Sequence, residues 1–362
     1  MTLDADGLAR LRLIRTRSIG PITYFQLLQR FGSAEAALEM IPALARRGGG
    51  TPPRVPSRAE ADREVVAVAA LGGRYLLLGR DDYPPLLAQI ETAPPALIVM
   101  GDTALLRRRM VAMVGARNAS AAAVRFAREL AHQLVEEKFV VVSGLARGID
   151  TAAHAGSIEG GTIGVIAGGI DVVYPPENEA LQRAISERGL LVSEQPPGTE
   201  PRARHFPYRN RIIAGLSEGT VVVEAAPRSG SLITARLAAE SGREVMAVPG
   251  SPLDPRAQGC NQLIRDGATL VQSAADIAAT LRPFGGDRVM APTPGFGAAP
   301  VPVDASEAER RAVTGLLSPS PVAVDEIVRQ SGLAPASVQT VLLELELAGR
   351  LERHAGGRVS LA

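Results

Sequence analysis

Six short apolar runs in the middle of the chain constrain its fold more than any other feature. They read MVAMVGA, FVVVSG, TIGVIAGG, GLLVSE, TVVVEA and EVMAVPG, and each is bounded by Gly, Pro or Ser. Helical stretches such as AAVRFARELAHQLVEE and LITARLAAESG separate them, and two further strand-like runs, RYLLLG and ALIVMG, precede them. Continuous apolar runs of this length are typical of strands buried on both faces, and strands that alternate with helices form parallel sheets. The sequence therefore predicts an α/β domain with a Rossmann-like parallel sheet over residues 74–283.

The rest of the chain predicts two smaller domains, because 362 residues exceed one ordinary core. Residues 1–73 show helical spacing, and SIGPITYFQLLQRFG predicts a short helix, a turn and a helix. This element is either of the SAM or helix-hairpin-helix type, which would clip a phosphate, or a plain packing module; the paired glycines usual in a phosphate clip are missing. Residues 284–306 are rich in Gly, Pro and Ala and predict a linker. Three helical stretches and a hairpin over 307–362 predict a winged helix.

Composition bounds the compartment and the partners. The single cysteine, Cys260, excludes an internal disulfide and a cysteine-based zinc cluster, so no metal site is expected. The N-terminal residues lack the order of a signal peptide, and no apolar run reaches the ~18 residues that cross a bilayer. We therefore expect a soluble, cytoplasmic protein without a membrane partner. Net charge is only +1, and Lys138 is the only lysine, so any basic site must be built from arginine.

The loops after the predicted strands are where a ligand is expected, because ligands of open parallel sheets bind at the carboxyl ends of the strands. These loops combine glycines, which let a backbone approach a ligand closely, with serines and arginines that hold anions. The candidates that they contribute are Gly115, Arg117, Ser120, Ser143, Gly144, Arg147, Gly148, Gly168, Gly169, Arg209, Arg211, Ser229, Gly230 and Ser231. Arginine recurs in four of the five loops, which suits several phosphates in a row.

Neither a nucleotide cofactor nor a catalytic set is expected at this edge. The first turn reads VGARNASA instead of the dinucleotide fingerprint, and no phosphate-loop lysine motif occurs. Ser143 does not lie in a nucleophile elbow, and His154 and His205 have no serine and carboxylate arranged around them. We expect His154 to pack or cap within a helix and Asp150 to cap the helix TAAHAGS. Asp171 either stabilises a turn or orients an arginine.

Seven motifs in this order resemble the DprA (Smf) family of DNA-processing proteins over about 210 residues. They are VGARNAS, VVSGLARGIDTAAH, GTIGVIAGGIDVVYPPEN, GLLVSEQPPG, HFPYRNRIIAGLSEGTVVVEA, SGSLITARLAAESGREVMAVPG and GCNQLIRDGATL. The resemblance implies a non-catalytic, homodimeric protein that binds single-stranded DNA, protects it, and loads RecA onto it in natural transformation. It needs no cofactor.

The same resemblance assigns roles to individual residues. Arg117 belongs to the family's G-[SA]-R motif and is expected to grip a phosphate, although Ala116 replaces the commoner serine. Arg147 and the YRNR segment, with Arg209, Asn210 and Arg211, are the next candidates; alternatively, these two RNR arginines tie loops together through Glu194 or Glu224. Phe206 and Tyr174 either stack on bases or pack against neighbouring prolines. Arginine must replace the lysine often found in the family's pocket.

The two alternative functions are a nucleotide-hydrolysing enzyme and a transcription regulator. Nucleotide-hydrolysing Rossmann-like enzymes carry P-G-G-x-G-T-x-x-E, but the corresponding segment APRSGSLITARLAAE lacks the paired glycines and the well-placed glutamate. A transcription regulator would read duplex DNA with the winged-helix segment PASVQTVLLELELAGR. That segment carries Glu344 and Glu346 and is poor in the basic residues that face a major groove. We expect it to contact protein, or DNA weakly through Arg353 and Arg358.

Overall fold

The computed structural model describes residues 3–282, 304–354 and 356–362, which form two compact units. One unit comprises residues 64–282, and the other joins residues 3–63 to residues 304–362. The predicted linker over 284–306 lies, except for its last three residues, outside the described part of the chain. The two units are described separately below.

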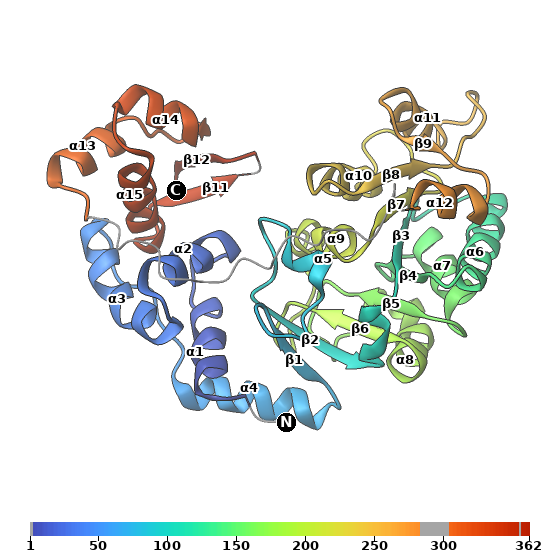
Figure 1. The fold of residues 1–362 in the computed structure, drawn as a ribbon, viewed down its shortest axis with the longest axis horizontal. Coiled ribbons are helices and arrows are strands. Elements are labelled where there is room, and N and C mark those ends of the chain that lie inside the picture. The colour runs from blue at the N-terminus through green and yellow to red at the C-terminus, as the bar shows by residue number, and fades with distance from the viewer. Residues whose placement is uncertain (1–2, 283–303, 355) are drawn as a thin grey trace. The chain divides into compact units, whose positions relative to one another are not determined.

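A nine-stranded sheet forms the centre of the first unit (Figure 1). Its order is β1-β2-β6-β5-β4-β3-β7-β8-β9, and β3 to β9 run parallel, whereas β1 and β2 pair antiparallel. The strands are β1 (Arg74–Leu77), β2 (Ala96–Gly101), β3 (Met110–Val114), β4 (Val140–Ser143), β5 (Thr162–Val165), β6 (Leu190–Ser193), β7 (Gly219–Val222), β8 (Glu244–Ala247) and β9 (Thr269–Leu270). The six apolar runs are β3 to β8, so the predicted Rossmann-like sheet is confirmed.

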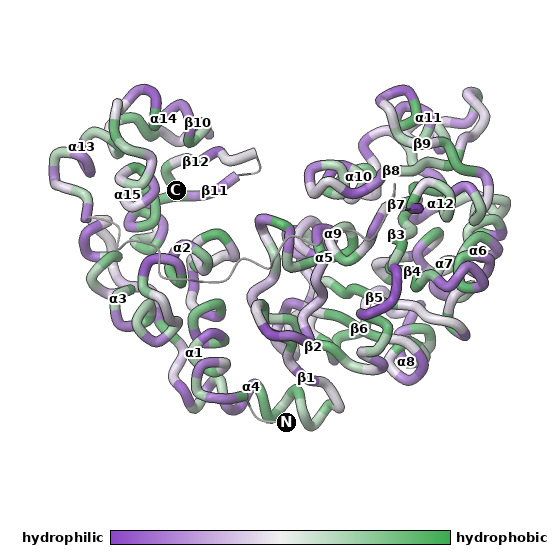
Figure 2. The backbone as a smooth tube through the Cα atoms, in the orientation of Figure 1, coloured by the Kyte–Doolittle hydropathy of each residue, from purple (hydrophilic) through white to green (hydrophobic). Residues whose placement is uncertain are grey.

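Helices cover both faces of this sheet, with α6, α7 and α12 on one side and α5, α9 and α10 on the other (Figure 1). The helices of this unit are α4 (Arg58–Ala70, which begins in the other unit), α5 (Pro85–Ala88), α6 (Ala121–Glu136), α7 (Ile149–Ser157), α8 (Glu179–Arg188), α9 (His205–Leu216), α10 (Gly230–Glu240), α11 (Gln258–Arg265) and α12 (Ala274–Thr280), with short 3₁₀ turns at Thr103–Arg107 and Pro176–Asn178. One buried hydrophobic cluster includes Leu130 and Leu134 of α6, Ile277 of α12, and Val111 and Met113 of β3. Figure 2 shows hydrophobic residues gathered along these central strands. Burying them removes apolar area from water, which is the main stabilisation of such a core.

The second unit combines the N-terminal helices with the C-terminal winged helix. Its elements are α1 (Ala5–Ile14), α2 (Pro21–Phe31), α3 (Ala34–Arg47), α13 (Glu307–Gly315), α14 (Val324–Ser331), α15 (Pro335–Leu347), β10 (Val322–Ala323), β11 (Leu351–His354) and β12 (Arg358–Leu361). The three strands form an antiparallel sheet in the order β10-β12-β11, so the predicted three helices and hairpin are confirmed.

Helix α15 belongs to two cores at once. Val341 and Leu345 lie in the winged-helix core, whereas Leu343 and Leu347 lie in the core of α1–α3. Glu344, which is fully buried, pairs with Arg310 of α13 at 2.7 Å. Helix α15 has few basic residues, and the structure supplies the reason: both of its sides are covered by other elements of the same unit.

Candidate nucleic-acid interface

The carboxyl ends of the central strands surround two neighbouring cavities. The first, of about 230 Å³, lies among the loops after β4 and β5 and the start of α9. The second, of about 510 Å³, lies between the loops after β3 and β7, where the strand order of the sheet reverses. Arg117, Ala146, Phe206 and Arg209 line both cavities. Ligands of open α/β sheets bind at such a reversal, because the loops on its two sides diverge and leave a crevice.

Most of the predicted site residues line one of these cavities, but five do not. Those in the linings are Gly115, Arg117, Gly144, Arg147, Gly168, Phe206, Arg209, Asn210, Ser229, Gly230 and Ser231. Those outside both linings are Ser120, Ser143, Gly148, Gly169 and Arg211. The members of the second group contact other parts of the protein; Gly169, for example, donates its N–H to the Thr199 carbonyl oxygen at 2.8 Å.

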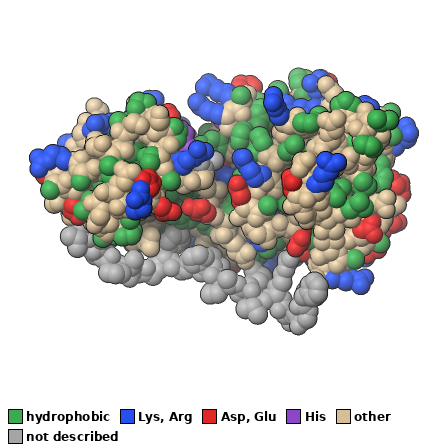
Figure 3. Space-filling view, turned by 90° about the horizontal axis from the view of Figure 1, so that it is seen from above, with side chains coloured by type: hydrophobic (Ala, Val, Ile, Leu, Met, Phe, Trp, Pro, Cys, Tyr) green, Lys and Arg blue, Asp and Glu red, His purple; other side chains and the backbone are tan. Residues whose placement is uncertain are grey.

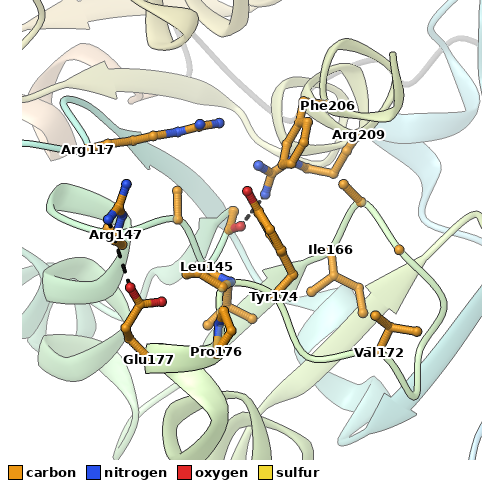
Figure 4. A pocket seen from close by; sticks show the side chains of 15 residues that line it. Arg117, Leu145, Arg147, Ile166, Val172, Tyr174, Pro176, Glu177, Phe206 and Arg209 are labelled. Atoms are coloured by element: carbon orange, nitrogen blue, oxygen red, sulfur yellow. Dashed lines mark hydrogen bonds and ion pairs between the residues drawn. The ribbon is translucent and has the colours of Figure 1, made fainter. Parts of the chain in front are cut away.

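Arg117, in the loop after β3, lies exposed at the boundary between the two cavities. Its guanidinium carbon lies 5.3 Å from the centre of the Phe206 ring, within cation–π range. The Phe206 ring in turn lies 5.7 Å from that of Tyr174, at an interplanar angle of 56°. Figure 4 shows Arg117 reaching across the opening toward Phe206, with Tyr174 below. A charged fork beside an aromatic pair can take a phosphate and a base side by side.

Arg209, on α9, is buried and works largely inside the protein. Its Nη1 donates to the carbonyl oxygens of Gly144 and, at 2.8 Å, Val165, and its Nε donates to Asn210 at 3.1 Å. Burial lowers its pKa to about 10. A Cβ on residue 144 would overlap this guanidinium, so a side chain there would displace Arg209 from its carbonyl partners. Arg209 therefore joins the loops after β4 and β5 and adds positive charge to the floor of both cavities.

Arg211 does not reach either cavity. It is 6% exposed, and its Nη2 donates to both carboxylate oxygens of Glu194 at 2.6 Å. Of the two roles considered for this residue, the structure therefore favours the tie to Glu194, because the guanidinium has a buried carboxylate and no path to the cavities.

Three further candidates serve the backbone. The Ser143 hydroxyl is fully buried and donates to the Met113 carbonyl at 2.6 Å, joining β4 to β3. Ser120 caps α6 and donates to Glu224 at 2.7 Å. Gly148 has φ +77°, and a Cβ there would overlap the Ala116 carbonyl. The absence of a side chain at Gly148 therefore allows the loop after β4 to pack closely against the loop after β3.

The expectation that Asp150 caps its helix is wrong. Helix α7 begins at Ile149, and Gly148 is its N-cap, without a side-chain cap. The buried Asp150 carboxylate instead turns back to accept the N–H groups of Gly144 and Ala146 at 3.2 and 3.4 Å. Asp171 stabilises a turn, because its carboxylate accepts the Gly198 N–H at 2.8 Å.

Sequence reasoning missed part of the lining. Arg256, in the loop after β8, lines the second cavity, and Glu177, in the loop after β5, lines the first and lies 3.8 Å from Arg147. Asn118 also lines the second cavity, together with Arg228, which is the arginine that the sequence places in the loop after the fifth of these strands. The loop after the sixth apolar run, PGSPLDPRAQ, would have yielded Arg256 had the strand-end argument been applied to it as to the other five.

Arginines outnumber carboxylates in the linings of the two cavities. Five arginines (Arg117, Arg147, Arg209, Arg228 and Arg256) line them against two carboxylates, Asp150 and Glu177. On the face drawn in Figure 3, basic, acidic and apolar side chains are interspersed. A chain of net charge +1 can therefore still have a local excess of positive charge at these cavities.

His154 belongs to the core of the unit. It is fully buried, and its Nδ1 lies 2.7 Å from the Thr162 hydroxyl oxygen. Burial lowers its pKa to about 3, so it is neutral at physiological pH.

Within the described segments, no group of three His, Cys, Asp or Glu residues is placed to hold a metal ion. No helix in the same segments has the length and apolarity to cross a membrane.

Three family models match this chain. The model for DNA recombination-mediator protein A matches residues 74–282, that for the DprA-like N-terminal HHH domain residues 4–67, and that for the DprA winged helix domain residues 297–357. The first of these spans the sheet and both cavities.

Individual relatives agree with these models. The DNA processing protein DprA of Bacillus subtilis is 45% identical over 59% of this chain and 73% of its own length. The crystal structure of DprA from Streptococcus pneumoniae matches 77% of this chain and 98% of its own, with a TM-score of 0.63 and 36% identity. A DprA structure from Helicobacter pylori, described for its single-stranded DNA binding mode, matches 57% of this chain and 95% of its own, with a TM-score of 0.52 and 28% identity. By its sheet, its terminal domains and these similarities, the chain belongs to the DprA (Smf) family of DNA recombination mediators.

Proposed function

We propose that this protein binds single-stranded DNA across the two cavities and loads RecA onto it during recombination and natural transformation. The observation that carries the proposal is that five arginines line two adjoining cavities where the strand-end loops converge, with Arg117 and Arg209 beside the Phe206 ring. The Helicobacter pylori relative, described for its single-stranded DNA binding mode, supports the choice of ligand.

The site favours single strands because its aromatic groups lie between its cations. Phe206 and Tyr174 offer ring faces to unstacked bases, and each stacked base contributes roughly 1–3 kcal/mol. Arg117 lies over one of these rings, so a phosphate held by its fork would leave the adjoining base beside Phe206. In a duplex the bases are already stacked and are not available to these rings. We propose Arg117, Arg147 and Arg228 as phosphate ligands and Phe206 as the stacking platform.

Binding of a fluorescent oligo-dT, measured by anisotropy, tests this site. Arg117→Ala should weaken binding by about 10- to 100-fold, because a charge-assisted contact is worth about 1.5–3 kcal/mol. The matched control is Arg236→Ala, since Arg236 is an exposed arginine of α10 that pairs with Glu240 outside both cavities. Unchanged affinity in Arg117→Ala would remove this residue from the site.

The salt dependence of oligo-dT affinity is a second test of the same interface. Three phosphate contacts to a single strand release enough counterions to lower affinity roughly twenty-fold between 0.05 and 0.2 M salt. Arg117→Ala should reduce the slope of log affinity against log salt by about 0.7. An affinity independent of salt would contradict phosphate binding altogether.

RecA loading is tested by the rate at which RecA begins to hydrolyse ATP on single strands covered by a single-strand-binding protein. We expect this protein to shorten the lag before ATP hydrolysis and Arg117→Ala to lengthen it again.

We also propose a homodimer, and the open edge strand β9, with Leu270 46% exposed, offers one surface where two copies can meet. Sedimentation equilibrium should give twice the chain mass. The same function places the protein in the cytoplasm, with DNA and RecA.

Binding alone accounts for this function, so we propose no bond-breaking step. Release of free base from a panel of nucleotides would revive a hydrolase. Regulation of transcription through the winged helix is not favoured, because α15, the helix that would enter a groove, is covered by α3 within its own unit.

A further inference from the structure

We propose that Asp150 is the positioning residue of the DNA site, shaping the turn at residues 144–146 and taking up a proton when a strand binds. This inference rests on the proposed function, because its effect is measured as binding of single-stranded DNA. Asp150 lies at the start of α7 and lines the second cavity, yet it is only 6% exposed.

The turn at 144–146 lines the first cavity, its Ala146 also lines the second, and its conformation needs external support. Leu145 has φ +55°, a conformation that costs free energy for a residue with a branched side chain. Surrounding groups bond its carbonyls: Arg209 bonds that of Gly144, Asn178 that of Leu145 at 2.8 Å, and Thr151 that of Ala146 at 2.8 Å.

Asp150 supplies the matching acceptor for the N–H groups of this turn. One oxygen, Oδ2, accepts from both Gly144 and Ala146. Without that acceptor two N–H groups in the wall would lose a charged partner, and the strained turn would be free to relax. Because Ala146 lines both cavities, such a relaxation would alter the position at which a strand rests.

The charges around Asp150 make its protonation depend on what occupies the cavity. Arg209 of α9 and Arg117 of the loop after β3 face it and favour the ionised form, and His154 on α7 is neutral. Burial outweighs both arginines and raises the pKa of Asp150 to about 6. A phosphate bound by Arg117 brings a negative charge toward the carboxylate and raises this pKa further. Binding near pH 6.5 should therefore take up a proton, by about half a proton per strand for a further shift of one unit.

The test compares Asp150→Asn and Asp150→Ala with the wild-type chain. The asparagine keeps an acceptor oxygen and removes the charge, whereas alanine removes both. Asp276→Asn is the matched control, because Asp276 also accepts backbone N–H groups, in the cap of α12, and lines neither cavity. Oligo-dT affinity is measured by anisotropy at pH 7.5. Proton uptake is measured at pH 6.5 by titration calorimetry in two buffers of different ionisation enthalpy.

We expect Asp150→Ala to lose at least about tenfold in affinity and Asp150→Asn to stay within about threefold of wild type. Wild type and Asp276→Asn should take up a proton on binding, and Asp150→Asn should not. Wild-type affinity in Asp150→Ala, or equal loss in both folded variants, would overturn the positioning role. Undiminished proton uptake in Asp150→Asn would overturn the inference even if Asp150→Ala fails to fold. If instead the wild-type chain fails to bind oligo-dT, the proposed function has failed, and not this inference alone.

Discussion

Arginines that look equivalent in this sequence have different surroundings, and burial separates their roles. Arg117 is exposed over an aromatic ring, Arg209 is buried against carbonyls, and Arg211 is buried against a carboxylate. An exposed guanidinium can offer its donors to a phosphate, whereas the buried guanidinium of Arg211 is enclosed by the protein and lines neither cavity. Only the first kind is expected to change DNA affinity without changing stability.

Arg211→Ala should therefore destabilise the protein and leave the site intact. Removing one member of a buried ion pair leaves the other charge buried, so we expect a loss of about 3–5 kcal/mol in the free energy of unfolding. Arg188→Ala is the control, since Arg188 pairs with Glu159 on the surface and should cost less than about 1 kcal/mol. Urea unfolding gives both values. A loss of more than tenfold in oligo-dT affinity by folded Arg211→Ala would contradict the structural role.

His154 should make stability fall on the acid side. Its folded pKa of about 3 lies below the unfolded value of 6.5, so its contribution is complete above pH 6.5 and is lost as pH falls toward 3. Relative to His154→Asn, the wild-type free energy of unfolding should fall by as much as about 1.4 kcal/mol per pH unit in that window. Denaturation at several pH values measures this difference. Parallel profiles for wild type and His154→Asn would refute the prediction.

At the scale of elements, α15 shows how one helix can join two ends of a chain. A helix that is apolar almost all round is buried on all sides, and here the winged-helix core takes one face and α1–α3 take the other. Its two glutamates are paired, Glu344 with Arg310 and Glu346 with Arg353 at 2.8 Å. The N-terminal helices and the winged helix are therefore expected to unfold together.

Leu343→Ala tests this coupling. The side chain is 2% exposed and lies in the core of α1–α3, so its truncation should cost about 2–5 kcal/mol. Hydrogen exchange should then show loss of protection in α1–α3, although the substitution lies some 300 residues away in the sequence. Leu253→Ala, at a position 91% exposed, is the control. Unchanged protection of α1–α3 would show that the two segments unfold independently.

At the scale of the whole molecule, both cavities lie within one unit. Every residue of their linings falls between 114 and 256, inside the sheet unit. The second unit carries its own cores and its own ion pairs, such as Arg30 with Asp304 at 2.6 Å. DNA affinity and the stability of the terminal unit should therefore vary separately.

A fragment of residues 64–282 should accordingly bind oligo-dT within about threefold of the full chain, since it retains all the arginines of the site. Circular dichroism and a cooperative thermal transition establish that the fragment folds, and anisotropy gives its affinity. A loss greater than tenfold in a folded fragment would mean that the terminal unit contributes to the interface.

The sequence by itself determined the sheet, its strands and the edge at which we propose that a ligand binds. These follow from local signals: apolar runs of strand length, helical spacing between them, and the rule that parallel strands end at one edge. Eleven of the candidate residues line the cavities because strand-end loops are brought together by that rule. The winged helix was equally readable from its three helices and Gly-centred hairpin.

Tertiary structure decided which of the polar residues face a ligand and which face the protein. Whether Arg211 meets a phosphate or Glu194, and whether Asp150 caps its own helix or turns toward residues 144–146, depends on groups far away in the sequence. The packing of α15 against α3 could not be predicted from the sequence either, because an apolar helix face does not specify which surface will cover it. The charge and hydrogen-bonding capacity of a residue are set by its side chain, but its burial and its partners are set by the fold. At this site, burial and partners distinguish the expected phosphate ligands from the residues that hold the loops.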